Sequence, residues 1–287
     1  MERARVVDSH IHFWDPAALH YPWLDGMPAM QRVFLPSDYA PLVTSDVDAV
    51  IVVEANCLAA ESEVEVVFID DLARVDPRIV GMVAFVDLFD EENLRRALGR
   101  LHQHGRVVGV RQNIQGHQPG FCTGDIFVRG VERVGQAGLC FDLCATSDQL
   151  AEVARLVERC SGTQFVLDHC GKPAIRDDAF DSWARDLAAI AAHDNVACKL
   201  SGLLTETRAD RRGTNALHAY AEHALACFGV SRLLYASDWP VVTLAGGVSA
   251  WRTFTDAFTA GWHPADRQRF YADNAIRLYG VELHAPT

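Results

Sequence analysis

Short apolar runs rich in valine, isoleucine and leucine recur along the chain, and an amphipathic stretch of helical period follows each one. Eight such runs are expected to form strands: RVVDSHIH, DAVIVVEA, IVGMVAFVD, RVVGVRQN, GLCFDLCA, QFVLDHCG, NVACKLSG and RLLYASDW. Because they are apolar through most of their length, they suit strands that are covered on both faces, as in a parallel sheet. The intervening helices are predicted at residues 61–75, 91–104, 125–137, 148–160, 180–193, 214–228, 249–260 and about 265–279.

Eight strands alternating with eight helices favour one α/β architecture, a closed (β/α)8 barrel with some distortion. An open doubly wound sheet usually has fewer strands and a glycine-rich first turn, and neither GxGxxG nor GxxxxGK[ST] occurs. Barrels of about 250 residues fold as one unit, so the 287 residues are predicted to form a single domain spanning 1–287. The longest irregular stretch, about 13–45, follows the first strand and is predicted to cover the substrate at the barrel mouth.

The charge of the chain narrows the classes of partner. The formal net charge is -12, and the 26 lysines and arginines form no basic cluster, which argues against nucleic acid. No run of 18 apolar residues occurs, and the opening MERARVVDSH lacks the apolar core of a signal peptide. We therefore expect a cytoplasmic protein that acts on a small molecule and does not enter membranes, with its oligomeric state left open.

Polar side chains stand at or just beyond the carboxyl end of each predicted strand. In a barrel these ends form the mouth, where barrel enzymes carry their chemistry. The candidates, in chain order, are His10 and His12, Glu54, Asp87, Arg111, Asp142, His169, Lys199 and Asp238.

Four of these residues suggest catalysis. His10 and His12 are separated by one residue, so on a strand both imidazoles face the same way and can hold one metal ion or one substrate oxygen; a hydrogen-bonded structural pair is the alternative. Asp238, in YASDWP, is interpreted as a general base for water rather than as a solvated loop aspartate. His169, in FVLDHCGKP, is interpreted as an electrophile on the substrate or a further metal ligand rather than as an interior histidine.

Substrate contacts are harder to assign. Arg111 would be unfavourable if unpaired so near the interior, and it either bridges Asp142 or Glu54 or binds carboxylate or hydroxyl groups of a ligand. Tyr21 and Trp23 offer aromatic faces to a sugar ring, although packing of the long loop explains them equally well. Glu54 and Lys199 complete the substrate-binding candidates.

Together these segments resemble the amidohydrolase superfamily, in its lactonase branch. The matching segments span nearly the whole chain: VDSHIHFWDP, YPWL, LPSDY, VVEA, GVRQN, GLCFDL, FVLDHCGKP, CKLSGL, ASDWP and FYADNAIRLYG. The branch includes sugar lactonases such as the L-fuconolactonase and L-rhamnonolactonase types and pyrone-dicarboxylate lactonases, and the opening FWDP with YPWL is most similar to the L-fuconolactonase type. The resemblance implies a distorted (β/α)8 barrel in which His10, His12, His169 and Asp238 occupy the family's active-site positions.

The implied reaction is hydrolysis of a sugar lactone, best L-fuconolactone or a related aldonolactone, by activated water. The fourth run carries Arg111 where binuclear members of the superfamily have a carboxylated lysine or a glutamate, so two metals are not expected. One divalent ion, zinc foremost, on His10, His12 and Asp238 with His169 as a further ligand, or no metal, fits the sequence. The alternatives are hydrolysis of a dicarboxylate lactone, metal-dependent decarboxylation of an aromatic or unsaturated acid, and a catalytically silent sugar-binding barrel.

Overall fold

Eight parallel strands follow one another around the molecule in the order in which they occur in the chain. In the computed structural model, which describes residues 4–43, 46–208 and 215–283, the strands are β1 Val7–Ile11, β2 Ala49–Val53, β3 Ile79–Phe85, β4 Val107–Arg111, β5 Cys140–Leu143, β6 Phe165–Leu167, β7 Val196–Leu200 and β8 Leu233–Tyr235. The eight predicted runs each contain one of them. The predicted (β/α)8 barrel is confirmed.

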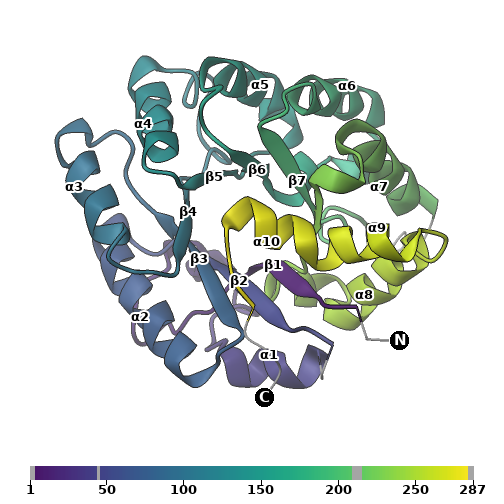
Figure 1. The fold of residues 1–287 in the computed structure, drawn as a ribbon, viewed down its shortest axis with the longest axis horizontal. Coiled ribbons are helices and arrows are strands. Elements are labelled where there is room, and N and C mark those ends of the chain that lie inside the picture. The colour runs from purple at the N-terminus through teal and green to yellow at the C-terminus, as the bar shows by residue number, and fades with distance from the viewer. Residues whose placement is uncertain (1–3, 44–45, 209–214, 284–287) are drawn as a thin grey trace.

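The helices surround this sheet and cover its outer face (Figure 1). They are α1 Pro36–Val43, α2 Ser62–Val75, α3 Glu91–Leu101, α4 Asp125–Gln136, α5 Leu150–Arg159, α6 Phe180–Ala191, α7 Asn215–Phe228, α8 Gly247–Phe258, α9 Pro264–Gln268 and α10 Asn274–Tyr279. The helix predicted near 265–279 is divided, because a π-helical turn, Arg269–Asp273, separates α9 from α10. The predicted start of the seventh helix, residue 214, lies outside the described residues. None of the described helices combines the length and the apolar character that a membrane span requires.

The barrel is distorted, as predicted. Register shifts interrupt the pairing of β1 with β2, of β2 with β3 and of β3 with β4, and β6 and β8 are only three residues long. Closure between β1 and β8 rests on the isolated bridge from Ile11 to Trp239 just beyond β8. Of the long loop at 13–45, residues Pro22–Gly26 form a 3-10 turn and Pro36–Val43 form α1; positions 44 and 45 lie outside the described residues.

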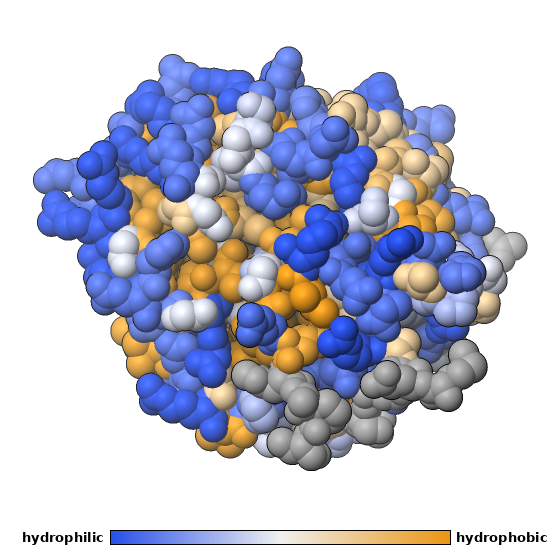
Figure 2. Space-filling view, in the orientation of Figure 1, coloured by the Kyte–Doolittle hydropathy of each residue, from blue (hydrophilic) through white to orange (hydrophobic). Residues whose placement is uncertain are grey.

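Helices α9 and α10 lie across one end of the barrel (Figure 1). This is the amino-terminal end of the strands, because the Cys140 thiol at the start of β5 donates to Leu278 O and the Asn274 amide donates to Leu233 O at the start of β8. Ala275 and Tyr279 complete an apolar cluster with side chains of the strands. Figure 2, in the same orientation, shows hydrophobic side chains gathered near the middle of this end. The opposite end is therefore the one available for chemistry.

The hydrogen bonds of the Tyr279 hydroxyl allow the packing of α10 against this end of the barrel to be tested. It donates to Asp142 at 2.8 and 2.9 Å from the two carboxylate oxygens, in a buried setting. Replacing Tyr279 by Phe leaves a buried carboxylate with one donor fewer, so we expect the free energy of unfolding to fall by about 1–3 kcal/mol, measured by urea denaturation.

Tyr21 supplies a matched control. Its ring is 3% exposed, and its hydroxyl has no hydrogen-bond partner among the described residues. Tyr21→Phe removes an unsatisfied buried group, so its stability should equal or slightly exceed that of the wild type. An equal decrease in the free energy of unfolding in the two variants would contradict the stabilising role assigned to the Tyr279 hydroxyl.

Candidate active site

His10 and His12 both turn toward the barrel centre, and a bulge in β1 makes this possible. Between Asp8 and Ile11 the strand carries one residue more than its partner β2. Asp8 accepts a hydrogen bond from the Tyr39 hydroxyl on α1, whereas His10, two residues on, contacts Asp168 in the interior. A regular strand would point both the same way, so the bulge re-aims the side chain.

Asp238 lies beside the histidines because the end of β1 pairs with the segment that follows β8; we call this pairing the seam of the barrel. The Asp238 N–H donates to His10 O at 2.9 Å, and the His12 N–H donates to Trp239 O at 2.7 Å. Asp238 has a left-handed backbone, with φ of 60°. Its Oδ1 lies 3.9 Å from His10 Nε2 and 3.6 Å from His12 Nε2.

His169 comes from a left-handed turn directly after β6. His169 and Cys170 have φ of 53° and 52°, and Lys172 has φ of 44°. The turn brings His169 Nε2 to 3.8 Å from Asp238 Oδ1, while its Nδ1 lies 2.8 Å from the Ser201 hydroxyl. Gly202 makes room for the ring, because a Cβ there would lie 2.7 Å from His169 Cβ.

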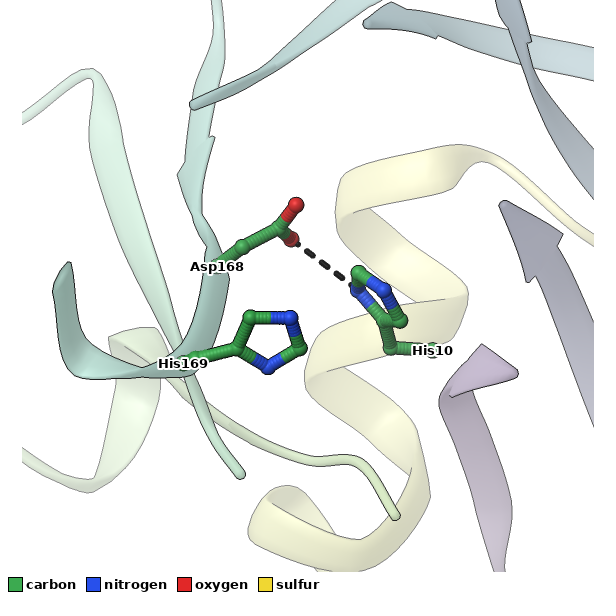
Figure 3. A group of neighbouring side chains, drawn as sticks. All are labelled: His10, Asp168 and His169. Atoms are coloured by element: carbon green, nitrogen blue, oxygen red, sulfur yellow. Dashed lines mark hydrogen bonds and ion pairs between the residues drawn. The ribbon is translucent and has the colours of Figure 1, made fainter. Parts of the chain in front are cut away.

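A buried ionic network supports the histidines from below. Asp168 Oδ1 lies 3.1 Å from His10 Nδ1 and 2.9 Å from Lys199 Nζ, and its Oδ2 lies 3.3 Å from the Arg111 guanidinium. Figure 3 shows Asp168 and His10 pointing toward each other, with the His169 ring beside them. Burial alone would raise the pKa of Asp168, but the Lys199 ammonium and His10 hold it well below its usual range. Asp168 is therefore an anion that orients His10.

The protonation states favour an ionised acid among neutral imidazoles. Burial would raise the pKa of Asp238, yet His169 and a hydrogen bond from His12 hold it well below its usual range. Burial also lowers the pKa of His169 to about 4 and that of His10 well below its usual value. At neutral pH Asp238 is thus a carboxylate beside the uncharged imidazoles of His10 and His169.

The donor atoms fit one divalent cation. His12 Nδ1 lies 2.8 Å from Val53 O, so this nitrogen carries the hydrogen and Nε2 presents a lone pair. His10 is oriented in the same way by Asp168. The two Nε2 atoms face each other at 3.1 Å with Asp238 Oδ1 beside them. Zinc–nitrogen bonds in a tetrahedral site place two nitrogens about 3.3 Å apart, so these side chains suit a single such ion.

A cavity of about 530 Å³ opens onto these groups. His12, His169 and Asp238 line it, and Pro22, Trp23 and Met27 of the long loop form part of its wall. The remaining polar residues of the wall are Asn56, Arg111, Asn113, Gln115, His117 and Lys172. Four of them occupy every second position, 111, 113, 115 and 117, from the end of β4 into the turn that follows it.

The predicted substrate-binding residues fall into two groups. Trp23 and Arg111 line the cavity, and their contact with substrate stays a prediction. Tyr21, Glu54 and Lys199 are not among the described residues that line it. Tyr21 packs against Trp14, with ring centroids 6.4 Å apart, while Glu54 and Lys199 are 1% and 0% exposed and belong to the ionic network.

Two strand-end acids lie elsewhere than predicted. Asp87 is exposed beyond β3 and accepts a hydrogen bond from the Phe89 N–H, so it takes no part in the mouth. Asp142 is buried under the site, bound to Lys199 and Tyr279. Of the two bridges considered for Arg111, the one to Glu54 is present, at 2.6 Å. The bridge to Asp142 was the wrong alternative, because Asp168 takes that place.

Sequence reasoning missed Asp168, Lys172 and the amide side chains beyond β4. Asp168 and Lys172 both lie in FVLDHCGKP, the segment in which only His169 was predicted to belong to the site. Asn113 and Gln115 follow Arg111 at every second position, and this alternation past a strand end was the available signal. Asn113 Nδ2 donates to Asn56 Oδ1 at 3.1 Å, and its own Oδ1 is buried with no partner among the described residues.

Comparisons with known proteins agree with this geometry. A protein of Burkholderia multivorans named L-fucono-1,5-lactonase is 32% identical over 291 residues, which cover 96% of each chain. A crystal structure of an amidohydrolase from Burkholderia multivorans with bound HEPES is 30% identical, with a TM-score of 0.88 over 97% of this chain and 100% of that one. A second crystal structure of such an amidohydrolase, with bound zinc, is 29% identical, with a TM-score of 0.85 and the same coverage. The amidohydrolase family profile matches residues 7–281, so this chain belongs to the amidohydrolase family.

Proposed function

We propose that the protein hydrolyses a sugar lactone to the open-chain acid, with L-fuconolactone or a related aldonolactone as substrate. The observation that carries the proposal is the ionised Asp238 among three imidazoles, facing a cavity with a polar wall. The names of the lactonase relatives support the same reaction class.

The charges in the cavity favour an uncharged ring over a dicarboxylate. Arg111 donates from Nε to Glu54 Oε1 and from Nη2 to Glu54 O, and Nη1 faces Asp168, so its charge is already balanced. Lys172 is the one other lysine or arginine among the described lining residues, and it donates to Gln115 Oε1. Ring hydroxyls would match the amide groups of Asn113 and Gln115, while the Trp23 ring suits an apolar sugar face.

Asp238 acts as the base in the proposed mechanism. Its carboxylate takes a proton from water, and the water oxygen bonds to the lactone carbonyl carbon. His169, neutral and held through Nδ1 by Ser201, donates from Nε2 to the developing oxyanion. The bond from this carbon to the ring oxygen then breaks, and Asp238 returns its proton to that oxygen, giving the hydroxy acid.

His10, His12 and Asp238 would hold a divalent cation, with His169 beside them. Such an ion, when bound, supplies Lewis-acid polarisation of the carbonyl and lowers the pKa of water. The buried Asp168 keeps His10 oriented for this purpose, as carboxylates behind metal-binding histidines do. Lys199 in turn forms ion pairs with both Asp168 and Asp142.

A lactone panel tests the proposal directly. We expect purified protein to release acid rapidly from one or more of the fucono-, rhamnono-, galactono- and arabinono-lactones, followed with a pH indicator. Two dicarboxylate lactones should react at least about tenfold more slowly, because the described lining residues provide no second uncompensated cation. Silence across the sugar lactones, with metal content verified, would overturn the assignment.

Asp238→Asn tests the base. General-base catalysis typically contributes about 10²–10⁴-fold in rate, so kcat should fall by about that factor. Binding of the open-chain product acid, measured by calorimetry, should be retained. Asp87→Asn, a change at an exposed acid outside the site, serves as the control and should leave kcat intact. A fully active Asp238→Asn enzyme would contradict the mechanism.

Metal removal tests the cation. Dialysis against a chelator should leave a protein free of metal by elemental analysis, with kcat reduced by at least about tenfold, and one equivalent of zinc should restore it. The metal-free protein should also unfold at a lower temperature, because a ligand that binds only the folded state stabilises it. Unchanged activity at zero metal content would show that the side chains act alone.

A further inference from the structure

A second, smaller cavity of about 240 Å³ opens beside the larger one. The two share the side chains at the reaction centre, His169 and Asp238, together with Met27, Lys172 and Val241. The residues that line only the smaller cavity are Gly202, Thr205, Glu206, Leu244 and Ala245. The reacting groups therefore stand where two compartments meet.

The lactone ring does not require the smaller cavity, because the larger one can hold it. The larger cavity, about 530 Å³, lies within the range of complete small-molecule sites. A water-sized group, comparable to a methyl, takes up roughly 30 Å³, so about 240 Å³ accommodates several such groups. The mechanism described above gives this space no occupant.

The walls of the smaller cavity suit a hydroxylated carbon chain. The Glu206 carboxylate offers an acceptor for hydroxyl hydrogens, and the Lys172 ammonium offers a donor. The Thr205 hydroxyl donates to Gly202 O at 2.7 Å, which leaves its oxygen as a second acceptor. Val241 and Ala245, both lining the cavity, provide apolar surface for carbon atoms.

The backbone that carries the Glu206 side chain is held by two hydrogen bonds. The Glu206 N–H donates to Gly202 O at 3.3 Å, and Glu206 O accepts from the Arg176 N–H at 3.2 Å. Lys172, Arg176 and Asp238 are the charged groups that act on the Glu206 carboxyl. An acceptor fixed on a held backbone can select a hydroxyl at low entropic cost.

We propose that the smaller cavity is a subsite for the substituent on the ring carbon whose oxygen leaves, and that it takes a hydroxymethyl group or a longer hydroxylated chain. Among the proposed substrates, such a subsite favours aldonolactones with a hydroxylated substituent there over the six-membered L-fuconolactone, which carries a methyl group. This inference rests on the proposed lactone hydrolysis. The breaking bond lies next to Asp238 and His169, at the junction of the two cavities. With the ring in the larger cavity, the substituent on the leaving-oxygen side is the part of the substrate nearest the smaller one.

Filling the smaller cavity tests the subsite. Leu244 is 37% exposed at its edge, so Leu244→Trp narrows it without disturbing the core. The assay compares kcat/KM for lactones of matched ring stereochemistry that carry a hydrogen, methyl, hydroxymethyl or dihydroxyethyl group at the leaving-oxygen carbon. We expect the ratio of dihydroxyethyl to hydrogen substrates to fall by at least about tenfold in Leu244→Trp.

Val75→Trp, at a site 85% exposed at the end of α2, is the matched control and should keep the wild-type ratio. A Leu244→Trp enzyme with the same ratio as wild type would overturn the subsite while leaving lactone hydrolysis intact. Silence of the wild type toward every lactone would instead overturn the proposed function, and the subsite with it.

Glu206 tests the chemistry of the subsite separately from its size. Glu206→Leu removes the acceptor, and the preference for hydroxymethyl over methyl substrates should fall by about tenfold, mainly through KM. Glu206→Gln keeps an acceptor of the same shape and should recover most of the preference. Equal preference in wild type, Glu206→Gln and Glu206→Leu would contradict a hydroxyl-binding role.

Discussion

The closure of the barrel between β1 and β8 is the constraint on which the site depends. Two backbone hydrogen bonds, from Asp238 N to His10 O and from His12 N to Trp239 O, join segments more than 220 residues apart. They bring a carboxylate beside two imidazoles, and two side chains of β1 reinforce them, because Ser9 Oγ donates to Tyr235 O and Asp8 Oδ1 accepts from the Ser237 N–H. Because the pairing beyond β8 is short, a small change at this seam would move Asp238 relative to the histidines.

Beneath the seam, buried charges have to be compensated, and their compensation sets the orientation of the imidazoles. An isolated ion in the barrel interior would be strongly unfavourable. The positive charges of Lys199 and Arg111 therefore compensate the Asp168 carboxylate. The same carboxylate also accepts a hydrogen bond from His10. Positions that looked like substrate contacts in the sequence, Glu54 and Lys199, are explained by this requirement. The network thereby fixes which nitrogen of His10 faces His12.

The strand and helix pattern was predictable because apolar runs and amphipathic stretches report burial directly, and polar residues at strand ends reported the mouth. Three features were not predictable in this way. The bulge that re-aims His10 depends on pairing with β2, which no local pattern records. The role of Asp168 depends on partners from β4 and β7, Arg111 and Lys199. Asp87 shows the converse error, since it lies past a strand end and yet is exposed to solvent outside the mouth.

Residues with strained backbone conformations are concentrated around the larger cavity. Of the six described non-glycine residues with positive φ, four line the larger cavity: Asn56, His169, Lys172 and Asp238. Each such conformation is unfavourable by about 1–3 kcal/mol and persists only where the surroundings determine it. The seam holds Asp238, and Gly202 leaves the space that His169 requires. Because Asp238, His169 and the lysine between the two cavities are held in conformations the chain would not adopt alone, they would not have to reorganise when substrate arrives. In the proposed mechanism this preorganisation would lower the barrier to ring opening.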